Sequence, residues 1–174
     1  MGAKERLTEW VKKKHGAQLI RRTKEPYYNH LIAVAEMAAP FLTLGYEIGL
    51  CHDLLEDTDA TQEDLMEALL RFGYPDGDAE FITSCVVELT DVFTADAYPG
   101  LSKAERKNRE AARLVTMTAA AQTVKYADLI YNVKWVLTYD QKHAQKYRRK
   151  KTLLLADMNG GNEELWQQAV NCFS

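Results

Sequence analysis

The feature that most limits the fold is helical patterning along nearly the whole chain. Four prolines and nine glycines are spread over 174 residues, and no run of alternating β-branched residues indicates a strand. Apolar residues instead recur at helical spacing, and Thr61 and Ser102 have the character of helix N-caps. We therefore expect an all-α fold, with residues 1–174 forming a single domain, a bundle of roughly eight to ten helices.

The expected helices follow from this patterning and from the turn-forming residues between them. Pro26 is suited to the entry of a helix, and Gly160-Gly161 separates the last two helices. The longest segment without helical periodicity runs from Thr90 to Gly100. The pattern predicts helices over residues 7–15, 26–39, 46–55, 61–72, 79–89, 102–114, 122–139, 141–156 and 163–172.

Composition excludes several classes of protein. A hydrophobic content of 47% with 27% charged residues is ordinary for a soluble globular domain, and a net charge of −3 argues against a nucleic-acid binder. No apolar run approaches the ~18–20 residues that cross a bilayer, and residues 1–6 do not resemble a secretory signal. Three widely spaced cysteines form no disulfide framework. We expect a cytoplasmic protein without membrane or nucleic-acid partners, and the oligomeric state stays open.

Residues 51–58 carry the most informative polar pattern. His52-Asp53 and Glu56-Asp57 lie within an apolar run, and residues three or four apart share one face of a helix. Unpaired buried charge is costly, and a divalent cation bound by imidazole and carboxylate would neutralise it. A surface helix end with solvated acids is the simpler explanation of an isolated His-Asp pair, so further ligands are needed.

Two other helices supply such ligands. His30 lies on an apolar helix face and Asp128 inside the apolar segment 124–130. Taken singly, His30 would be explained as a core histidine, and Asp128 as a capping or salt-bridged acid. Together with His52 and Asp53 they make two imidazoles and two carboxylates on three helices. Such a set leaves positions for water and substrate, as a catalytic metal site requires.

The order of these residues on an all-α chain resembles the HD-domain phosphohydrolase superfamily. Residues 52–58 are similar to the HDxxEDT signature of the hydrolase domain of RelA/SpoT-type proteins and of small alarmone hydrolases of the metazoan SpoT-homologue type. Residues 21–30 resemble the RKxxxPYxxH segment and residues 125–132 the KLADxxxN segment of that family. Residues 89–91 and 103–107 look like its VTD and KxERK elements, and the resemblance covers about residues 7–150.

The resemblance implies a single HD-type domain that uses one Mn²⁺ ion to remove the 3′-pyrophosphate from guanosine tetra- or pentaphosphate. The implied metal ligands are His30, His52, Asp53 and Asp128. The implied acids that position and deprotonate the attacking water are Glu56 and Asp57. The implied nucleotide-binding residues are Arg21, Arg22, Lys103, Asn132 and, with a shorter spacing than in the family, Tyr147.

Departures from the family pattern bear on this expectation. Leu129 stands where the family has Arg or Lys, which removes a positive charge and would alter phosphate contacts, whereas Tyr126 and Cys51 are packing changes. The chain ends at residue 174, so we expect hydrolysis without a synthetase activity. The basic run from Lys146 to Lys151 has no role implied by the family, and we interpret it as a solvated helix face.

Other functions stay open on the sequence alone. Within the alarmone-hydrolase interpretation, ppApp and NADPH are possible substrates. Another HD-domain phosphohydrolase, of the 5′-nucleotidase or dNTP triphosphohydrolase type, would share the metal ligands but would not be expected to carry Glu56-Asp57 together with Arg21-Arg22. A non-catalytic nucleotide-sensing module is the third alternative, although such a module needs no water-activating acids.

Overall fold

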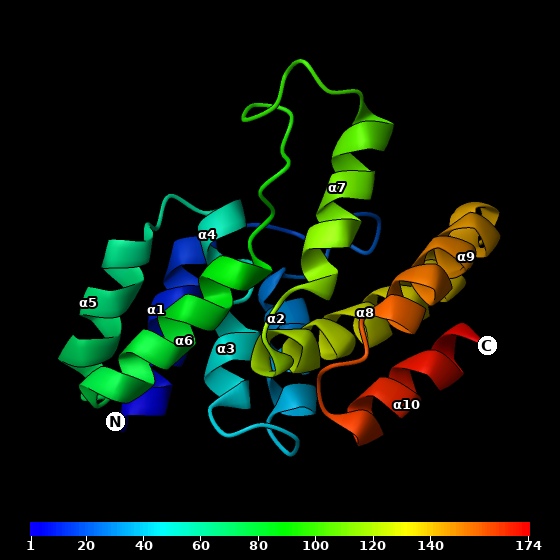
Figure 1. Cartoon of the computed structure of the whole chain (residues 1–174). Helices are drawn as coiled ribbons and strands as arrows, with labels where there is room; N and C mark the ends of the chain where they lie inside the picture. Colours follow the sequence, from blue (N-terminus) through cyan, green and yellow to red (C-terminus); the bar gives the residue numbers. More distant parts are fainter.

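The computed structural model describes all 174 residues, and they form ten α-helices and no strand (Figure 1). The predicted all-α fold is confirmed. None of the helices combines the length and apolar character needed to cross a membrane. The helices are α1 (Ala3–His15), α2 (Tyr28–Ala38), α3 (Gly45–Cys51), α4 (Leu54–Asp57), α5 (Gln62–Phe72), α6 (Asp76–Leu89), α7 (Lys103–Val115), α8 (Ala119–Tyr139), α9 (Gln141–Asp157) and α10 (Glu163–Phe173).

Local signals set the ends of two helices as the sequence predicts. At the start of α5 the Thr61 hydroxyl accepts from the Asp64 N–H at 3.1 Å, and the Asp64 carboxylate accepts from the Thr61 N–H. The same capping box forms between Ser102 and Glu105 at the start of α7. Each box satisfies two N–H groups that have no partner inside the helix. These boundaries are therefore determined by neighbouring residues.

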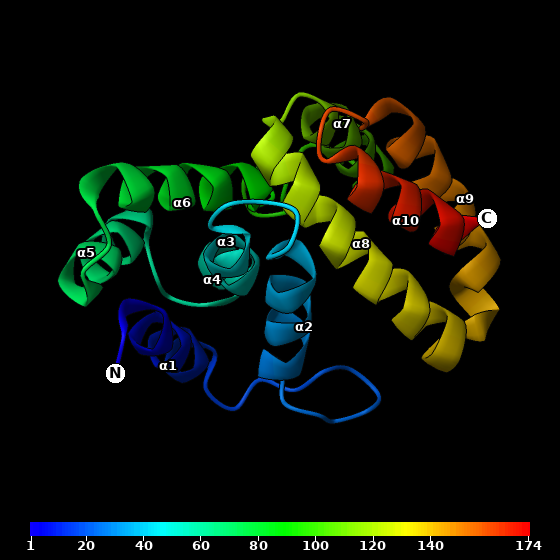
Figure 2. The same cartoon turned by 90° about the horizontal axis from the view of Figure 1, so that it is seen from below.

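The long helix α8 is the axis of the fold. It packs against α2, α3 and α6 on one side and against α9 and α10 on the other. Figure 2 shows α8 crossing between the group α1 to α6 and the group α7, α9 and α10. Residues of both groups belong to one hydrophobic core of 36 buried residues. Asp128, on the face of α8 that is buried in this core, is therefore held at the centre of the molecule.

The prediction of one continuous helix over residues 46–55 is wrong, because a turn at His52 and Asp53 interrupts the helix. Helix α3 ends at Cys51, and α4 begins at Leu54. The Nδ1–H of His52 donates to the Gly49 carbonyl at 2.6 Å, and in a continuous helix that carbonyl would accept from the Asp53 N–H. His52 and Asp53 thus lie in a turn between two short helices, and the stacking of His52 under Glu56 on one continuous helix does not apply.

Close packing of α2 on α3 depends on a glycine. A Cβ atom at Gly49 would lie 2.8 Å from the Ala35 Cα atom and 3.1 Å from the Val34 carbonyl oxygen. Those are backbone atoms of α2, which cannot turn aside as a side chain would. Gly49 therefore allows the two helices that carry His30 and His52 to approach each other.

Gly49→Ala is expected to destabilise the protein by about 1–3 kcal/mol, because the added methyl group forces α2 and α3 apart. Gly77→Ala is the matched control, since a Cβ atom there meets nothing within 4 Å, and alanine in a helix is favourable by up to about 1 kcal/mol. Urea denaturation of both variants measures the difference. Equal stability of the two variants would contradict the role assigned to Gly49.

Candidate active site

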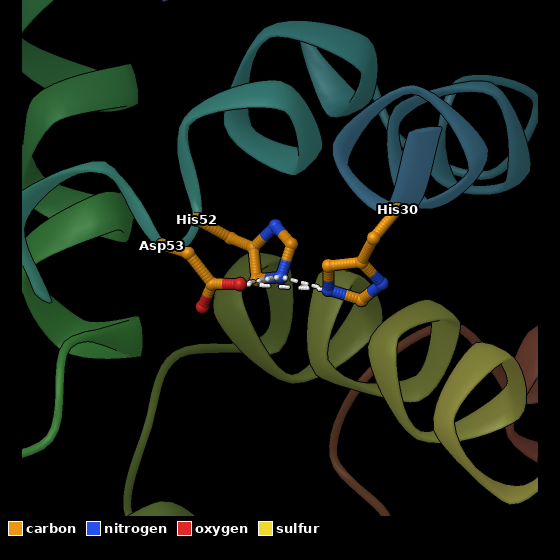
Figure 3. A group of neighbouring side chains, drawn as sticks. All are labelled: His30, His52 and Asp53. Carbon is orange, nitrogen blue, oxygen red and sulfur yellow. Dashed lines mark hydrogen bonds and ion pairs between the residues drawn. The ribbon is translucent and has the colours of Figure 1, made fainter. Parts of the chain in front are cut away.

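Two histidines from different helices meet at the centre of the molecule. His30 on α2 and His52 at the end of α3 place their Nε2 atoms 3.1 Å apart, and their exposed fractions are 4% and 3%. The bond from the His52 Nδ1–H to the Gly49 carbonyl leaves its Nε2 atom free to bind a ligand. Figure 3 shows both rings directed toward Asp53.

Two carboxylates approach the same imidazoles. The Asp53 Oδ2 atom lies 3.0 Å from the His52 Nε2 atom and 3.4 Å from the His30 Nε2 atom. The Asp128 Oδ1 atom on α8 lies 3.4 and 3.6 Å from the Nε2 atoms of His30 and His52. Ligand atoms of His30, His52 and Asp53 all lie within 4.8 Å of one another, an arrangement that can hold a metal ion.

The contacts around these carboxylates orient them. Asp128 accepts from the Lys125 ammonium and from the Asn132 amide, each at 2.7 Å. Asp53 accepts from the Tyr27 hydroxyl at 2.7 Å. Such outer contacts are the usual support of metal ligands in proteins.

The electrostatics of the cluster favour a bound cation. Burial lowers the pKa of His52, but Asp53 and Asp128 outweigh burial and raise it to about 10. Burial raises the pKa of Asp53, and the His52 and His30 imidazoles bring it far below its usual range. The negative charge of the carboxylates that raises the pKa of the imidazole would also attract a divalent cation to this site. Two nitrogen and two oxygen ligands without a thiolate fit manganese, iron or zinc.

A cavity of about 370 Å³ lies beside the cluster. The candidate ligands His30, Asp53 and Asp128 form part of its wall. The remaining wall residues are Ile20, Arg21, Tyr27, Glu56, Leu89, Asp91, Lys125, Tyr131, Asn132 and Trp135. The cavity is large enough for a small molecule, and its wall supplies both cations and acids.

The chain is similar in sequence to several pyrophosphohydrolases. No family model matches it. The guanosine-3′,5′-bis(diphosphate) 3′-pyrophosphohydrolase of Aquifex aeolicus is 31% identical over 155 residues, which cover 84% of this chain but 19% of that relative. The pyrophosphohydrolases MESH1 of Mus musculus and Homo sapiens are 29% and 28% identical over 157 residues, covering 85% of this chain and 79% of each relative. The chain is a homologue of these hydrolases.

A solved structure supports the fold. The structure of a metazoan ortholog of SpoT, reported to hydrolyze ppGpp, superposes with a TM-score of 0.80, covering 99% of this chain and 94% of that one at 23% sequence identity. This chain therefore has the helical fold that the sequence resemblance implied.

Glu56 is the better placed of the two candidate acids. Its side chain forms part of the cavity wall, and its Oε2 atom accepts from the Asp91 N–H at 3.1 Å. Desolvation raises its pKa, and the Asp91, Asp53 and Asp57 carboxylates raise it further. Asp57 is not among the wall residues, although desolvation and Asp53 raise its pKa too.

The candidate nucleotide-binding residues divide into two groups. Arg21 and Asn132 line the cavity. Arg22 does not, because its guanidinium pairs with the Asp140 carboxylate at 2.9 Å. Lys103 is exposed at the start of α7 and also lies outside the wall.

Tyr147 and Leu129, two further positions that the family comparison singled out, differ in how deeply they are buried. Tyr147 lies half-buried on α9 and is not among the wall residues, although burial together with the Asp128 charge raises its pKa. Leu129 is buried in the core with an exposed fraction of 1% and does not line the cavity. The residue that departs from the family pattern therefore makes no part of the wall in this protein.

Besides the aliphatic Ile20 and Leu89, five polar or aromatic wall residues received no role from the sequence. They are Tyr27, Asp91, Lys125, Tyr131 and Trp135. The first four lie in or beside segments with family resemblance, so their position in those segments was an available signal. Trp135 lies beyond any such segment, and its place became visible only in the folded chain.

Proposed function

We propose that the protein is a metal-dependent hydrolase that removes the 3′-pyrophosphate from guanosine tetra- or pentaphosphate, giving GDP or GTP and pyrophosphate. We also infer that residues 1–174 act as a single HD-type domain. The observation that carries the proposal is that His30, His52, Asp53 and Asp128 converge beside a cavity that Glu56 and Arg21 also line. The activity of the curated relatives supports the choice of substrate.

Mn²⁺ is the proposed ion, held by His30, His52, Asp53 and Asp128. When bound, it would lower the pKa of the attacking water and offset negative charge on the phosphoryl oxygens. The chain holds these ligands ready through contacts of its own. Gly49 fixes the His52 ring, Tyr27 holds Asp53, and Lys125 with Asn132 holds Asp128.

Glu56 and Asp57 are the proposed acids of the reaction. A carboxylate with a raised pKa accepts a proton from water more readily than an ordinary one. The Asp91 N–H fixes one oxygen of Glu56 and leaves the other for the attacking water. Asp57, on the same short helix α4, would assist by holding that water in line with the bond that breaks.

The proposed nucleotide-binding residues surround the remaining wall. Arg21 provides a planar guanidinium that can stack on a purine base or bind a phosphate. Asn132, which already donates to Asp128, has an amide oxygen left for the nucleotide. The other proposed contributors are Arg22, Lys103 and Tyr147.

The test of this function is a substrate panel. Purified full-length protein with Mn²⁺ is incubated with ppGpp, pppGpp, ppApp, NADPH, dNTPs and 5′-nucleotides, and the products are separated by chromatography. We expect GDP and pyrophosphate from ppGpp, with no turnover after chelation of the metal. Hydrolysis of a 5′-monophosphate with ppGpp left intact would contradict the proposed substrate and leave the metal-dependent chemistry.

Arg21→Ala is expected to raise KM by about tenfold or more with little change in kcat, because hydrogen bonds from a charged group contribute about 1.5–3 kcal/mol. Arg22→Ala is the comparison variant on the same loop, because Arg22 is also a proposed contributor but its guanidinium is engaged by Asp140. We expect a smaller change in KM for it. Steady-state kinetics measure KM and kcat of both variants. Unchanged KM and kcat in both would show that the loop does not bind the substrate.

A further inference from the structure

The basic run at residues 146–151 is not uniform in the folded protein. Lys146, Arg149 and Lys150 are exposed, whereas Lys151 is half-buried. Lys151 lies one helical turn after Tyr147 on the same face of α9, with its Nζ atom 5.8 Å from the centre of the Tyr147 ring. Helix α9 packs on α8, which carries Asp128, and the Asp128 charge acts on both Tyr147 and Lys151. Interpreting the whole run as solvated is therefore wrong for Lys151.

Lysines from two neighbouring helices act electrostatically on Lys151. Lys107 comes from α7, Lys125 from α8 and Lys151 from α9, and α9 packs on both other helices. Lys125 is neutralised by Asp128 at 2.7 Å. Lys107 and Lys151 have no ion pair and donate no hydrogen bond. The two carboxylates nearby are Asp91 and Asp128, and the second is already engaged.

Such an arrangement is electrostatically unfavourable without an anion. Burial, followed by the charges of Lys125 and Lys107, lowers the pKa of Lys151 to about 8, although Asp128 and Asp91 oppose the shift. Desolvation lowers the pKa of Lys107, and the charges of Lys103, Lys150 and Lys146 lower it further. A half-buried ammonium crowded by other ammonium groups is stabilised when a negative group enters between them.

We propose that Lys151 binds a phosphate group of the substrate, so that α9 contributes a cation to the site. The identity of that substrate as a nucleotide rests on the proposed function. A lysine ammonium is a compact charge that binds phosphate without a fixed orientation. Lys151 is not itself among the wall residues, but the charges of Lys125 and Asp128, which both line the cavity, act on it.

The experiment measures binding of inorganic pyrophosphate to the full-length protein by calorimetry, with the same Mn²⁺ concentration in cell and syringe. Lys151→Met removes the charge and keeps the length of the side chain. Lys142→Met is the control, because Lys142 is exposed and nine residues away, on the opposite face of α9. We expect Lys151→Met to weaken binding by about tenfold or more, and Lys142→Met to bind as the unmodified protein does.

Lys151→Gln and Lys151→Arg separate charge from packing. The proposal expects Gln to lose affinity as Met does and Arg to retain it. Pyrophosphate affinity unchanged in Lys151→Met, or lost equally in Lys151→Arg, overturns the proposal. Turnover of ppGpp by the unmodified protein is measured separately. If it is absent while Lys151→Met still loses affinity, the proposed function fails and the anion site stands.

Stability against pH provides a readout that does not depend on a ligand. A lysine with a folded-state pKa of about 8 and an unfolded one near 10.4 binds fewer protons in the folded state between those values. The unmodified protein should therefore gain stability as pH rises through this window, relative to Lys151→Met. Below pH 8 we expect Lys151→Met to have the higher Tm, and a lower Tm there would count against the crowding of Lys151.

Discussion

Replacing Glu56 by Gln is expected to lower kcat for ppGpp by about 10²–10⁴-fold, the usual effect of losing a general base. Gln keeps the size of the side chain and an oxygen that accepts from the Asp91 N–H. It cannot take a proton from water at neutral pH. Because the hydrogen bond of the Glu56 side chain goes to the Asp91 N–H and not to a proposed metal ligand, binding of Mn²⁺ and of the nucleotide should persist.

Stopped turnover with intact binding is the pattern that identifies this role. Mn²⁺ binding is followed by electron paramagnetic resonance and nucleotide binding by calorimetry. Asp57→Asn is the companion variant, for which the same pattern is expected, and Glu63→Gln is the control on the exposed surface of α5. Loss of the ion in Glu56→Gln would instead make Glu56 a ligand, and lower stability at an unchanged rate would make it a structural residue.

Asp128→Asn is expected to abolish activity and to destabilise the protein by about 3–5 kcal/mol, the cost of breaking a buried ion pair. The Asp128 carboxylate lies between Lys125 and the two imidazoles. Without its charge the Lys125 ammonium has no partner, and the ion loses one of its ligands. Urea denaturation and Mn²⁺ titration measure the two effects.

A second substitution separates these effects. In Lys125→Met/Asp128→Asn the unpaired ammonium is gone, so stability should recover in large part while Mn²⁺ binding stays lost. Recovery of Mn²⁺ binding in the double variant would contradict Asp128 as a ligand. Lys134→Met, an exposed lysine on the same helix, is the control and should change neither property.

The stability of the metal-free protein at acid pH should reveal the ion pair between Lys125 and Asp128. Burial raises the pKa of Asp128, but Lys125 and the imidazoles bring it well below its usual value. Because the folded-state pKa is the lower one, the stabilisation is present above the ordinary pKa of about 3.9 and is lost as pH falls toward the folded-state value. Asp128→Asn should remove this part of the acid dependence.

Much of the fold follows from short stretches of sequence. The capping boxes at Thr61 and Ser102 involve residues three apart, so the starts of α5 and α7 were predictable without knowledge of the rest of the chain. The candidate metal ligands were chosen on their residue types and their apolar surroundings. Residue type decides ligand chemistry, and a polar residue in an apolar segment implies burial. Each residue alone had a simpler explanation, so the candidates depended on their combination along the chain and on the family resemblance.

The interruption of the helix at His52 and Asp53 was not predictable in the same way. Nothing in residues 46–55 stops a helix, and the break comes from the bond between the His52 ring and the Gly49 carbonyl. That ring is held where α2, α3 and α8 pack together. The geometry of the ligands therefore depends on contacts between segments far apart in the chain.

The two arginines and the basic run also contain residues that are alike in sequence but have different surroundings in the folded protein. Arg21 and Arg22 are alike in sequence, but Asp140, more than a hundred residues away, engages only Arg22. Lys146 and Lys151 belong to one run, yet only Lys151 is half-buried. The sequence by itself determined the helices, the buried core and the residue types able to bind a metal. Tertiary structure alone decided which charges face the cavity, because burial and pairing depend on neighbours supplied by distant helices.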